Sequence, residues 1–248
     1  MSSERQDEIH HLLQTHGNLT VIELAKRFNV SEMTIRRDLK NLAAMGLIQR
    51  EHGRAIYPPV PIMDTLLNMG EAEQEKARIG HLAATLISEG DSIILDAGTT
   101  TLAVAQALNT KCTVITNSIP IASVLGNRDE ITVLMTGGEV RSGTFALAGP
   151  VTRSVLKGFN ADKLFLGATG VTIERGLSTA NMLESEVKQV MLKVAKEVIL
   201  VAHSAKIGQI YFHTFARWDS IQTLVTDAGL AEPVREKLNS LGVKVLLA

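Results

Sequence analysis

The stretch of residues 20–57 is the part of the chain that most constrains its fold. It reads as a short helix, a tight turn at residues 30–31, a second helix with the adjacent Arg36 and Arg37, and a basic hairpin that contains a glycine. Two helices followed by a basic hairpin are typical of a winged helix-turn-helix, whose second helix enters the major groove of DNA. The sequence therefore predicts a DNA-reading unit at residues 1–57.

The second helix of this stretch divides into two faces. Ile35, Leu39 and Leu42 fall together on one face, and we expect them to pack on the preceding helices. The first turns of such a helix meet base edges, while its flanks and the hairpin meet phosphates or the minor groove. The residues expected at base edges are Ser31, Met33, Thr34 and Arg37. Those expected at phosphates or in the minor groove are Arg36, Lys40, Arg50, His52 and Arg54.

Capping residues predict where the helices of this unit begin and end. Residues 3–16 carry apolar side chains at helical spacing. Thr20 and Glu23 have the spacing of a capping box at the start of the next helix. Ser31 is expected to cap the helix that follows, which runs to residue 45 and ends at Gly46.

The alternative to DNA binding is an ordinary solvated helix face, because arginine pairs are common on helices. The coincidence of the turn, the basic face and the basic hairpin favours DNA. Residues 31–57 hold five Lys or Arg against three Asp or Glu, and the whole chain has a formal net charge of −1. The positive field is therefore local and weak. Because few phosphate contacts are available to one copy, we expect a homo-oligomer, a dimer or a tetramer.

The composition excludes several classes of protein. The single cysteine, Cys112, allows no intrachain disulfide, and no apolar run approaches the ~18 residues of a membrane span. The charged N-terminus has no signal-peptide pattern. Aromatic residues are 4% of the chain, which disfavours a stacking platform for single-stranded nucleic acid. We expect a soluble cytoplasmic protein with no membrane partner.

A proline cluster at residues 57–61 marks the predicted domain boundary, since it continues neither a helix nor a central strand. We expect a DNA-reading domain at 1–57, a linker at 58–74 and a second domain at 75–248. A helix at about 62–80, with an acidic stretch, is expected to lead into the second domain.

Beyond the boundary, short β-branched runs alternate with helical segments. The expected strands are 92–96, 112–116, 131–135, 163–166, 198–202, 222–226 and 243–247. The expected helices lie at about 99–109, 118–127, 149–158, 183–196 and 230–241. The strands are apolar on both faces, as buried parallel strands should be. The fold class predicted for this part is a doubly wound, mostly parallel α/β domain.

A run of hydroxyl residues follows the first of these strands. Asp96-Ala-Gly-Thr-Thr-Thr101 ends the strand and begins a helix, whose free N–H groups and dipole favour an anion. The alternative is simply a threonine-rich helix start. The pattern is neither a P-loop nor a dinucleotide fingerprint, so we expect no nucleotide cofactor.

Other strand ends meet at the same edge of a parallel sheet, where ligands bind in such folds. Lys206 follows a strand and is expected to neutralise a phosphate, although a solvated loop lysine is the alternative. The expected effector-binding residues are Asp96, Gly98, Thr99, Thr100, Thr101, Asn117, Ser118, Gly137, Gly138, Gly170, Glu184 and Lys206.

No metal or nucleophile motif is found. The histidines lack the spacing of metal ligands, and Cys112 begins a buried strand as a small apolar residue. His203 and His213 flank one loop, either as polar pocket residues or as structural ones.

The chain resembles the DeoR family of bacterial sugar-metabolism regulators over nearly its whole length. The matching residues are Val30-Ser31, Thr34-Ile-Arg-Arg-Asp-Leu39, Gly46, Arg50-Glu-His-Gly53, Glu75-Lys76, Asp96-Ala-Gly-Thr-Thr-Thr101, Asn117-Ser118, Gly137-Gly138, Phe165-Leu-Gly167, Gly170, Gly176-Leu-Ser178 and Ser204-Ala-Lys206. The family's hairpin usually reads His-Gly-Gly-Ala, whereas this chain has Arg54 in place of the second glycine. The resemblance implies a transcriptional repressor that binds operator DNA and is controlled by a phosphorylated sugar.

The family's effector domain is similar in fold to ribose-5-phosphate isomerase, which supplies an enzyme as the rival hypothesis. Such isomerases carry an Asp-Gly-Ala-Asp segment and a nearby catalytic lysine. The similar stretch here, residues 166–170, lacks both carboxylates, and residues 174–177 offer no lysine. Glu184 matches the isomerase's helix-borne glutamate, but one acid without partners cannot move a proton between two carbons. The sequence therefore favours a sensor over an enzyme.

Overall fold

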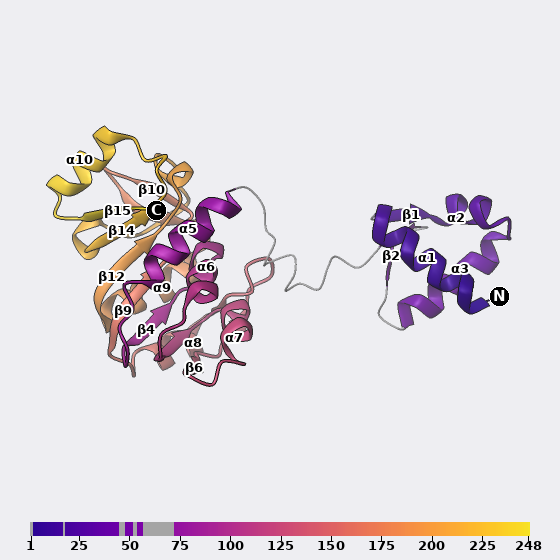
Figure 1. Cartoon of the computed structure of the whole chain (residues 1–248), viewed down its shortest axis with the longest axis horizontal. Coiled ribbons are helices and arrows are strands. Elements are labelled where there is room, and N and C mark those ends of the chain that lie inside the picture. Colours follow the sequence, from indigo (N-terminus) through magenta and orange to yellow (C-terminus); the bar gives the residue numbers. More distant parts are fainter. Residues whose placement is uncertain (1, 17, 45–47, 52–53, 57–71) are drawn as a thin grey trace. The chain divides into compact units, whose positions relative to one another are not determined.

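The chain forms two compact units, Met1–Asn68 and Met69–Ala248, which are described separately (Figure 1). The computed structural model describes residues 2–16, 18–44, 48–51, 54–56 and 72–248. The predicted linker at 58–74 lies almost entirely outside these residues, so its limits stay a prediction.

The first unit is a winged helix-turn-helix, as predicted. Its elements are α1 (Ser2–His16), β1 (Asn18–Thr20), α2 (Val21–Phe28), α3 (Glu32–Ala44), β2 (Gln49–Glu51) and β3 (Arg54–Ile56). The strands form a small antiparallel sheet in the order β1-β3-β2. Strand β1 was not predicted; it has only three residues, and its last, Thr20, is also the N-cap of α2. The predicted end of α3 at Gly46 lies outside the described residues.

Local capping explains the start and end of α2. The Thr20 side chain accepts a hydrogen bond from the Glu23 backbone, and the Glu23 carboxylate accepts one from the Thr20 N–H, which confirms the capping box. Asn29 ends the helix in the left-handed conformation. Ser31 then caps α3, and its hydroxyl accepts a hydrogen bond from the Thr34 N–H at 3.2 Å. These caps fix the tight turn between the two helices.

The core of the first unit lies between its three helices and the sheet. Ile35, Leu39 and Leu42 are at most 1% exposed, which confirms the predicted inward face of α3. They pack with Leu24 of α2 and with Ile9 of α1. One face of α3 is thereby fixed against the unit, and the other is left to solvent.

The second unit is built on a seven-stranded parallel sheet, as predicted. Its strands are β4 (Ser92–Leu95), β5 (Cys112–Thr116), β6 (Ile131–Met135), β9 (Ala161–Leu166), β12 (Ala195–Val201), β14 (Thr223–Thr226) and β15 (Lys244–Leu247). The order across the sheet is β15-β14-β12-β9-β4-β5-β6, and every neighbouring pair is parallel. The chain builds outward from β4 to β6 and then, starting from β9, outward to β15. The direction of winding therefore reverses between β4 and β9.

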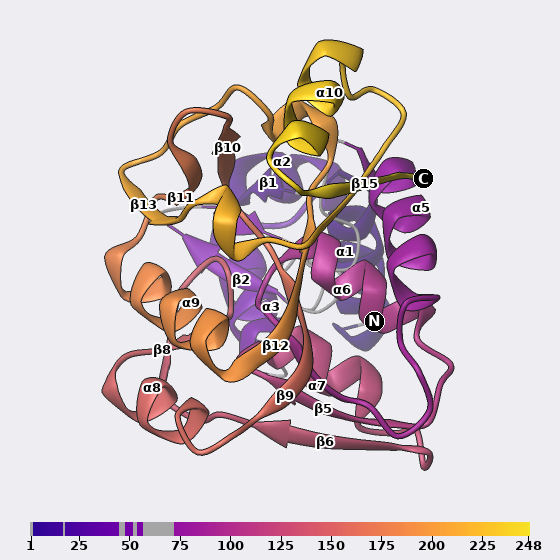
Figure 2. The ribbon, with the colours of Figure 1, turned by 90° about the vertical axis from the view of Figure 1, so that its left-hand side faces the viewer.

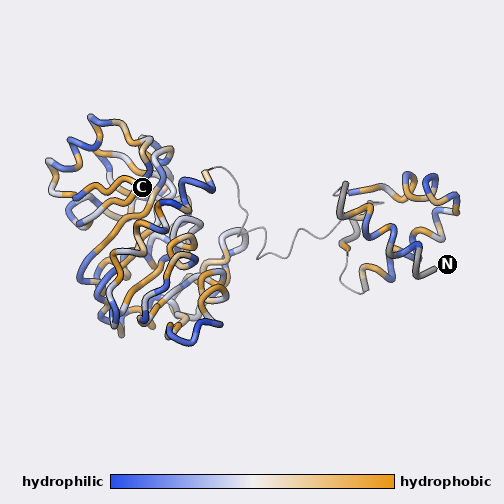
Figure 3. Tube along the Cα trace, in the orientation of Figure 1, coloured by the Kyte–Doolittle hydropathy of each residue, from blue (hydrophilic) through white to orange (hydrophobic). Residues whose placement is uncertain are grey.

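Helices cover both faces of this sheet. They are α5 (Glu73–Ala84), α6 (Thr99–Ala107), α7 (Ile119–Leu125), α8 (Pro150–Leu156), α9 (Met182–Val194) and α10 (Glu232–Ser240), with short turns η1 (Ser204–Lys206) and η2 (Trp218–Ser220). Helices α5, α6 and α7 lie on one side of the sheet, and α8 and α9 lie on the other (Figure 2). The hydrophobic colour follows the strands between these layers (Figure 3).

Two expectations about the strands need correction. The sheet is apolar on both faces only at its centre, because the edge strand β6 leaves Leu134 39% and Met135 46% exposed. The sequence also missed three short strand pairings away from the main sheet. A second sheet has the order β10-β11-β13, and β7 pairs with β8. Their bounds are β7 (Glu139–Val140), β8 (Leu147–Ala148), β10 (Gly170–Thr172), β11 (Gly176–Thr179) and β13 (His213–Ala216).

The helix predicted at about 62–80 corresponds to α5, of which the structure describes residues 73–84. It packs against α6 as part of the second unit, with Ile79 fully buried and Gly80 against the backbone of Ala103. A Cβ on Gly80 would lie 2.5 Å from that backbone, so only glycine allows the two helices to approach this closely.

Candidate functional site

The outward face of α3 presents the side chains predicted to meet DNA. Met33 is 76% exposed, and Arg37 and Lys40 are exposed on the same helix. Ser31 precedes the helix, and its hydroxyl lies 2.9 Å from that of Thr34. The first turn of α3 is therefore rigid and open to a large partner. Their contacts with DNA remain a prediction.

Arg36 lies on the flank of this face. Its guanidinium is 3.4 Å from the Glu32 carboxylate one turn earlier, and both side chains are about half exposed. An exposed pair of this kind contributes little to stability, so Arg36 can exchange Glu32 for a phosphate at small cost. In the hairpin, the backbones of Arg50 and Arg54 lie in β2 and β3. Their side chains and all of His52 lie outside what the structure describes.

The sequence analysis missed the structural role of Asp38. Its side chain is buried on α3, where it accepts hydrogen bonds from Arg5 Nε at 2.7 Å and from Gln6 Nε2 at 2.9 Å. These bonds fasten α1 to α3 and so hold the exposed face in place. The available signal was the position of Asp38, which is next to Leu39 and three residues after the buried Ile35.

A small cavity lies at the carboxyl ends of the parallel strands, where the winding of the sheet reverses. It has a volume of about 130 Å³ and is bounded by the loops after β4 and β9. This is the position at which open α/β sheets bind ligands. We call it the effector pocket, and its lining residues are Ala97, Gly98, Thr99, Thr100, Thr101, Thr144, Gly167, Ala168, Thr169, Glu184, Lys188 and Lys206.

Helix α6 directs its N-terminus at the effector pocket. Gly98 precedes the helix without a side-chain cap, so the first N–H groups have no such partner. The Thr101 hydroxyl donates to the Gly98 carbonyl at 2.9 Å and is therefore a structural group. The Thr100 hydroxyl is buried and has no hydrogen-bond partner. A buried polar atom without a partner at a helix N-terminus suits a bound anion.

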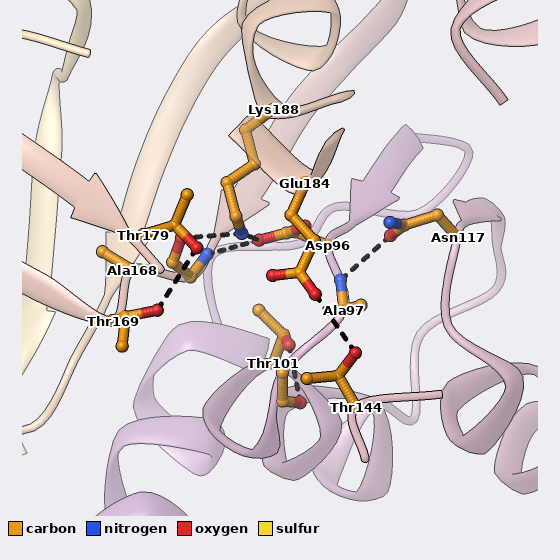
Figure 4. A network of polar contacts seen from close by, with 12 residues as sticks. Asp96, Ala97, Thr101, Asn117, Thr144, Ala168, Thr169, Thr179, Glu184 and Lys188 are labelled. Atoms are coloured by element: carbon orange, nitrogen blue, oxygen red, sulfur yellow. Dashed lines mark hydrogen bonds and ion pairs between the residues drawn. The ribbon is translucent and has the colours of Figure 1, made fainter. Parts of the chain in front are cut away.

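Asp96 forms a buried ion pair with Lys188 of α9 (Figure 4). Their side chains are 2% and 7% exposed. Asp96 also accepts a hydrogen bond from the Gly167 N–H at 3.0 Å, and Lys188 donates to the Gly167 carbonyl at 3.1 Å. The Lys188 ammonium lies 5.6 Å from the centre of the Phe215 ring. Asp96 is thus a neutralised part of the pocket wall and fixes the β9 loop.

Lys188 was not among the residues predicted from the sequence. A lysine was expected only at residues 174–177, by analogy with the isomerase. Lys188 instead reaches the site from α9, further along the chain. A signal was present, because Lys188 falls on the buried face of α9 with Val187 and Met191 and lies one turn after Glu184. A lysine among core positions requires a buried partner.

Lys206 reaches the pocket from η1, and its ammonium donates to the Ala168 carbonyl at 2.8 Å. Its pKa is lowered to about 8, first by burial and then by the positive charges of Lys188 and Lys76, against a smaller opposing effect of Asp96. The ammonium therefore lacks full electrostatic compensation, and an incoming anion would supply it.

Glu184 also lines the pocket. It projects from the first turn of α9, and its carboxylate accepts a hydrogen bond from the Thr144 hydroxyl at 3.2 Å (Figure 4). Thr144 belongs to the loop between β7 and β8, residues 141–146, and the sequence analysis did not select it. The fold thus brings together a residue of the β7–β8 loop and a residue of α9 that are 40 positions apart in the sequence.

Six predicted effector residues lie outside the pocket lining: Asp96, which pairs with the lining residue Lys188, and five others that contact the protein itself. Asn117 accepts from the Ala97 N–H at 3.0 Å and donates to the Leu147 carbonyl at 3.1 Å, so it positions the β4 loop. Ser118 caps α7 through the Ile121 N–H. Gly138 and Gly170 allow close packing, since a Cβ would lie 2.1 Å from the Thr152 hydroxyl and 2.5 Å from the Gln209 carbonyl oxygen, whereas at Gly137 it would make only an ordinary contact.

The two loop histidines are also placed outside the pocket lining. His213 Nδ1 lies 2.7 Å from the buried Ser185 hydroxyl. The pKa of His203 is lowered by burial and by the positive charges of Lys206 and Lys76. Cys112 is buried in β5, and burial raises the pKa of its thiol to about 11, so it is an inert core residue as predicted.

Comparisons with known proteins assign both units to domain families. Residues 5–59 match the model of the DeoR-like helix-turn-helix domain, and residues 71–228 match that of the DeoR C terminal sensor domain. The chain is 36% identical to the HTH-type transcriptional regulator GlpR of Haloferax volcanii, over 99% of this chain and 98% of that protein. It is 35% identical to the HTH-type transcriptional repressor GlcR of Bacillus subtilis, over 98% and 95%.

A solved structure of ribose 5-phosphate isomerase A from Methanocaldococcus jannaschii aligns with a TM-score of 0.41 and 16% identity. The alignment covers 55% of each chain. In the described residues, no helix is long and apolar enough to cross a membrane.

Proposed function

Because the chain belongs to the DeoR family of DNA-binding transcriptional regulators, we propose that it represses a carbohydrate-utilisation operon under the control of a phosphorylated sugar. The observation that carries the proposal is the effector pocket, which combines the free N-terminus of α6 with the Lys206 ammonium. Both groups favour an anion in a position where α/β sheets bind small molecules. The same chain carries a helix with exposed arginines, so ligand and DNA sites are covalently joined.

In this proposal the phosphate is held at the start of α6. The N–H groups of residues 99–101 and the Thr100 hydroxyl supply hydrogen bonds, and Lys206 supplies the charge. A dianionic phosphate gains from the helix dipole and from charge-assisted hydrogen bonds. Lys206 then exchanges the Ala168 carbonyl for a stronger acceptor.

On the DNA side, α3 enters the major groove. Ser31, Met33, Thr34 and Arg37 meet base edges, with Arg37 as the donor suited to a guanine. Arg36, Lys40, Arg50, His52 and Arg54 hold phosphates or the minor groove. A single unit of this size offers few such contacts, so the active form is a dimer or a tetramer on two half-sites, working in the cytoplasm where its operator is.

An isomerase remains the second candidate, and the convergence of Glu184, Lys188 and Lys206 on one pocket favours it more than the sequence did. Acid–base chemistry needs groups that are free to exchange protons. Lys188 and Asp96 instead neutralise each other in the pocket wall. We therefore propose a sensor without catalytic activity. Turnover of ribose 5-phosphate by the purified protein, absent from a Lys206→Gln variant, would support the enzyme instead.

The experiment that tests the proposal begins with thermal unfolding in the presence of commercial sugar phosphates and of the corresponding free sugars. Any compound that raises the melting temperature is then added to a complex of the protein with DNA from its own upstream region. We expect a sugar phosphate, and not the free sugar, to stabilise the protein and to change its affinity for that DNA. Stabilisation by the free sugar alone would contradict the proposed anion seat.

A further inference from the structure

The lining of the effector pocket contains groups of opposite charge. The N-terminus of α6 and the Lys206 ammonium attract an anion, whereas Glu184 supplies a carboxylate. Asp96 does not alter this contrast, because Lys188 neutralises it in the wall. In the described part of the chain, the side-chain partner of Glu184 is a neutral hydroxyl, that of Thr144. The lining therefore combines groups that attract an anion with a carboxylate that repels one.

This contrast decides which part of a sugar phosphate contacts which group. A phosphate beside Glu184 would place two like charges together in a partly buried site, which is unfavourable. The sugar hydroxyls have the opposite preference, because a carboxylate accepts hydrogen bonds from two neighbouring hydroxyl groups. With the phosphate at α6 and Lys206, the sugar hydroxyls are therefore the groups that contact Glu184 and Thr144.

The segments that line the pocket differ in how tightly they are packed, and so in how easily they can move. The 130 Å³ cavity is smaller than ligand pockets of ~300–1,000 Å³, so one wall must move to admit a sugar phosphate. Thr100, Thr101 and Lys188 are buried in packed helices. The 141–146 loop is instead exposed at Ser142, Gly143 and Thr144. We therefore expect this loop to move when a ligand enters.

We propose that Thr144 and Glu184 are the residues that distinguish one sugar phosphate from another, and that the β7–β8 loop closes over the sugar to do so. In the absence of ligand, the Thr144 hydroxyl donates a hydrogen bond to the Glu184 carboxylate. A sugar with hydroxyls at the matching positions replaces that bond, and Thr144 then closes on the sugar. This inference rests on the proposed function and names the part of the same pocket that sets its selectivity.

The test compares inorganic phosphate, which probes only the anion-binding groups at α6 and Lys206, with glucose 6-phosphate, fructose 6-phosphate, ribose 5-phosphate and glycerol 3-phosphate. Dissociation constants are measured by calorimetry for the wild type and for Thr144→Val and Glu184→Gln. Valine keeps the shape of threonine without its hydroxyl, and glutamine keeps the size of glutamate without its charge. Ser142→Ala is the matched control, since Ser142 is on the same loop and outside the pocket lining.

For the tightest sugar phosphate, we expect Thr144→Val to raise the dissociation constant about 5- to 10-fold and Glu184→Gln about 10-fold or more. Inorganic phosphate should bind both variants within about 2-fold of the wild type or, for Glu184→Gln, more tightly, because a repelling charge is gone. The order of preference among the sugar phosphates should change. Ser142→Ala should match the wild type throughout.

Equal weakening of phosphate and sugar phosphate would show a merely structural role and would overturn the inference. Unchanged sugar-phosphate binding by both variants would overturn it as well, while leaving the proposed function in place. A wild type that binds inorganic phosphate but none of the sugar phosphates would instead overturn the proposed function, and the inference with it.

Discussion

The two functional surfaces of this molecule are built in opposite ways. The face proposed for DNA comes from one helix, and its side chains point into solvent, with Met33 76% exposed. The effector pocket draws its lining from segments between residues 97 and 206, and it contains a buried ion pair. One surface can meet a large partner with little rearrangement. In our proposal the other must open and close around its ligand, which couples binding to a change of conformation.

The difference also appears in how charge is handled. On α3, the pair of Glu32 and Arg36 is about half exposed at 3.4 Å. In the pocket, Asp96 and Lys188 are nearly inaccessible to water. Removing one partner costs little at the surface, whereas in the interior it leaves an uncompensated charge. The charges of α3 are thus free for binding, and the interior pair shapes the site.

The largest expected effect comes from breaking the interior pair. Lys188→Met should lower the free energy of unfolding of the second unit by about 3–5 kcal/mol, because it leaves Asp96 buried without a partner. Chemical unfolding followed by tryptophan fluorescence measures this directly, since the only tryptophan, Trp218, is buried in that unit. Lys193→Met on the exposed side of α9 is the control, and a loss as large there would contradict the role given to the pair.

Binding by the exposed face should respond next. Arg37→Ala should weaken operator binding by about 1–3 kcal/mol if this side chain reads a base. Fluorescence anisotropy on operator and random duplexes is the measurement. An equal loss on both duplexes would make Arg37 a phosphate contact, and no loss on either, with the fold intact, would remove it from the interface.

The pocket, unlike the DNA face, should be sensitive to mild alkali. The pKa of Lys206 is about 8, and an anion prefers the protonated form, so effector affinity should fall about tenfold between pH 7 and pH 9. The effector phosphate stays dianionic over this range, since its second pKa is ~6. Calorimetry at several pH values tests this. Lys206→Arg stays charged and should flatten the profile, and an equally steep profile in that variant would point to another group.

The same shift has a consequence for stability. Lys206 has its ordinary pKa of 10.5 when unfolded and about 8 when folded, so burying its charge costs stability below pH 8. Between pH 8 and 10.5 the unfolded chain binds more protons than the folded one, and this contribution therefore makes unfolding less favourable as the pH rises.

The smallest effect is expected at the surface pair. Glu32→Gln removes the partner of Arg36, and the free energy of unfolding of the first unit should change by less than about 0.5 kcal/mol. Circular dichroism during thermal unfolding measures it. A loss comparable to that of Lys188→Met would erase the distinction between the two regions.

The sequence predicted the exposed face of α3 better than it predicted the effector pocket. The capping box at Thr20 and the buried face of α3 depend on residues within one or two turns, so periodicity and spacing reveal them. All seven strands of the main sheet are apolar runs between turn residues, and they were predicted for the same reason. The exposed faces of its edge strands were not, because exposure depends on which strands become neighbours.

The pocket shows where such reasoning stops. The hydroxyl run at residues 99–101 and Lys206 were found because each follows a predicted strand. Lys188 and Thr144 were missed, because each acts through a contact with a residue distant in sequence. The partner of Lys188 is 92 positions away, and that of Thr144 is 40 positions away. Asn117 and Gly138 were also predicted to bind the ligand; in the structure their hydrogen bonds and packing involve neighbouring loops, and their contact with a ligand stays a prediction. Position at a strand end indicates proximity, but only the fold decides which side chain enters the cavity.

The central claim is that the anion seat at α6 controls DNA binding without being part of it. Thr99→Asp tests this most directly, since Thr99 is half-buried at the helix start, whereas Thr100 is buried. The new carboxylate suits the helix N-terminus and repels a phosphate.

The measurement is operator affinity with and without the sugar phosphate that stabilises the wild type. The account predicts wild-type affinity for DNA without ligand and no response at any concentration to which the wild type responds. A variant that still responds to that compound at the same concentration would contradict it.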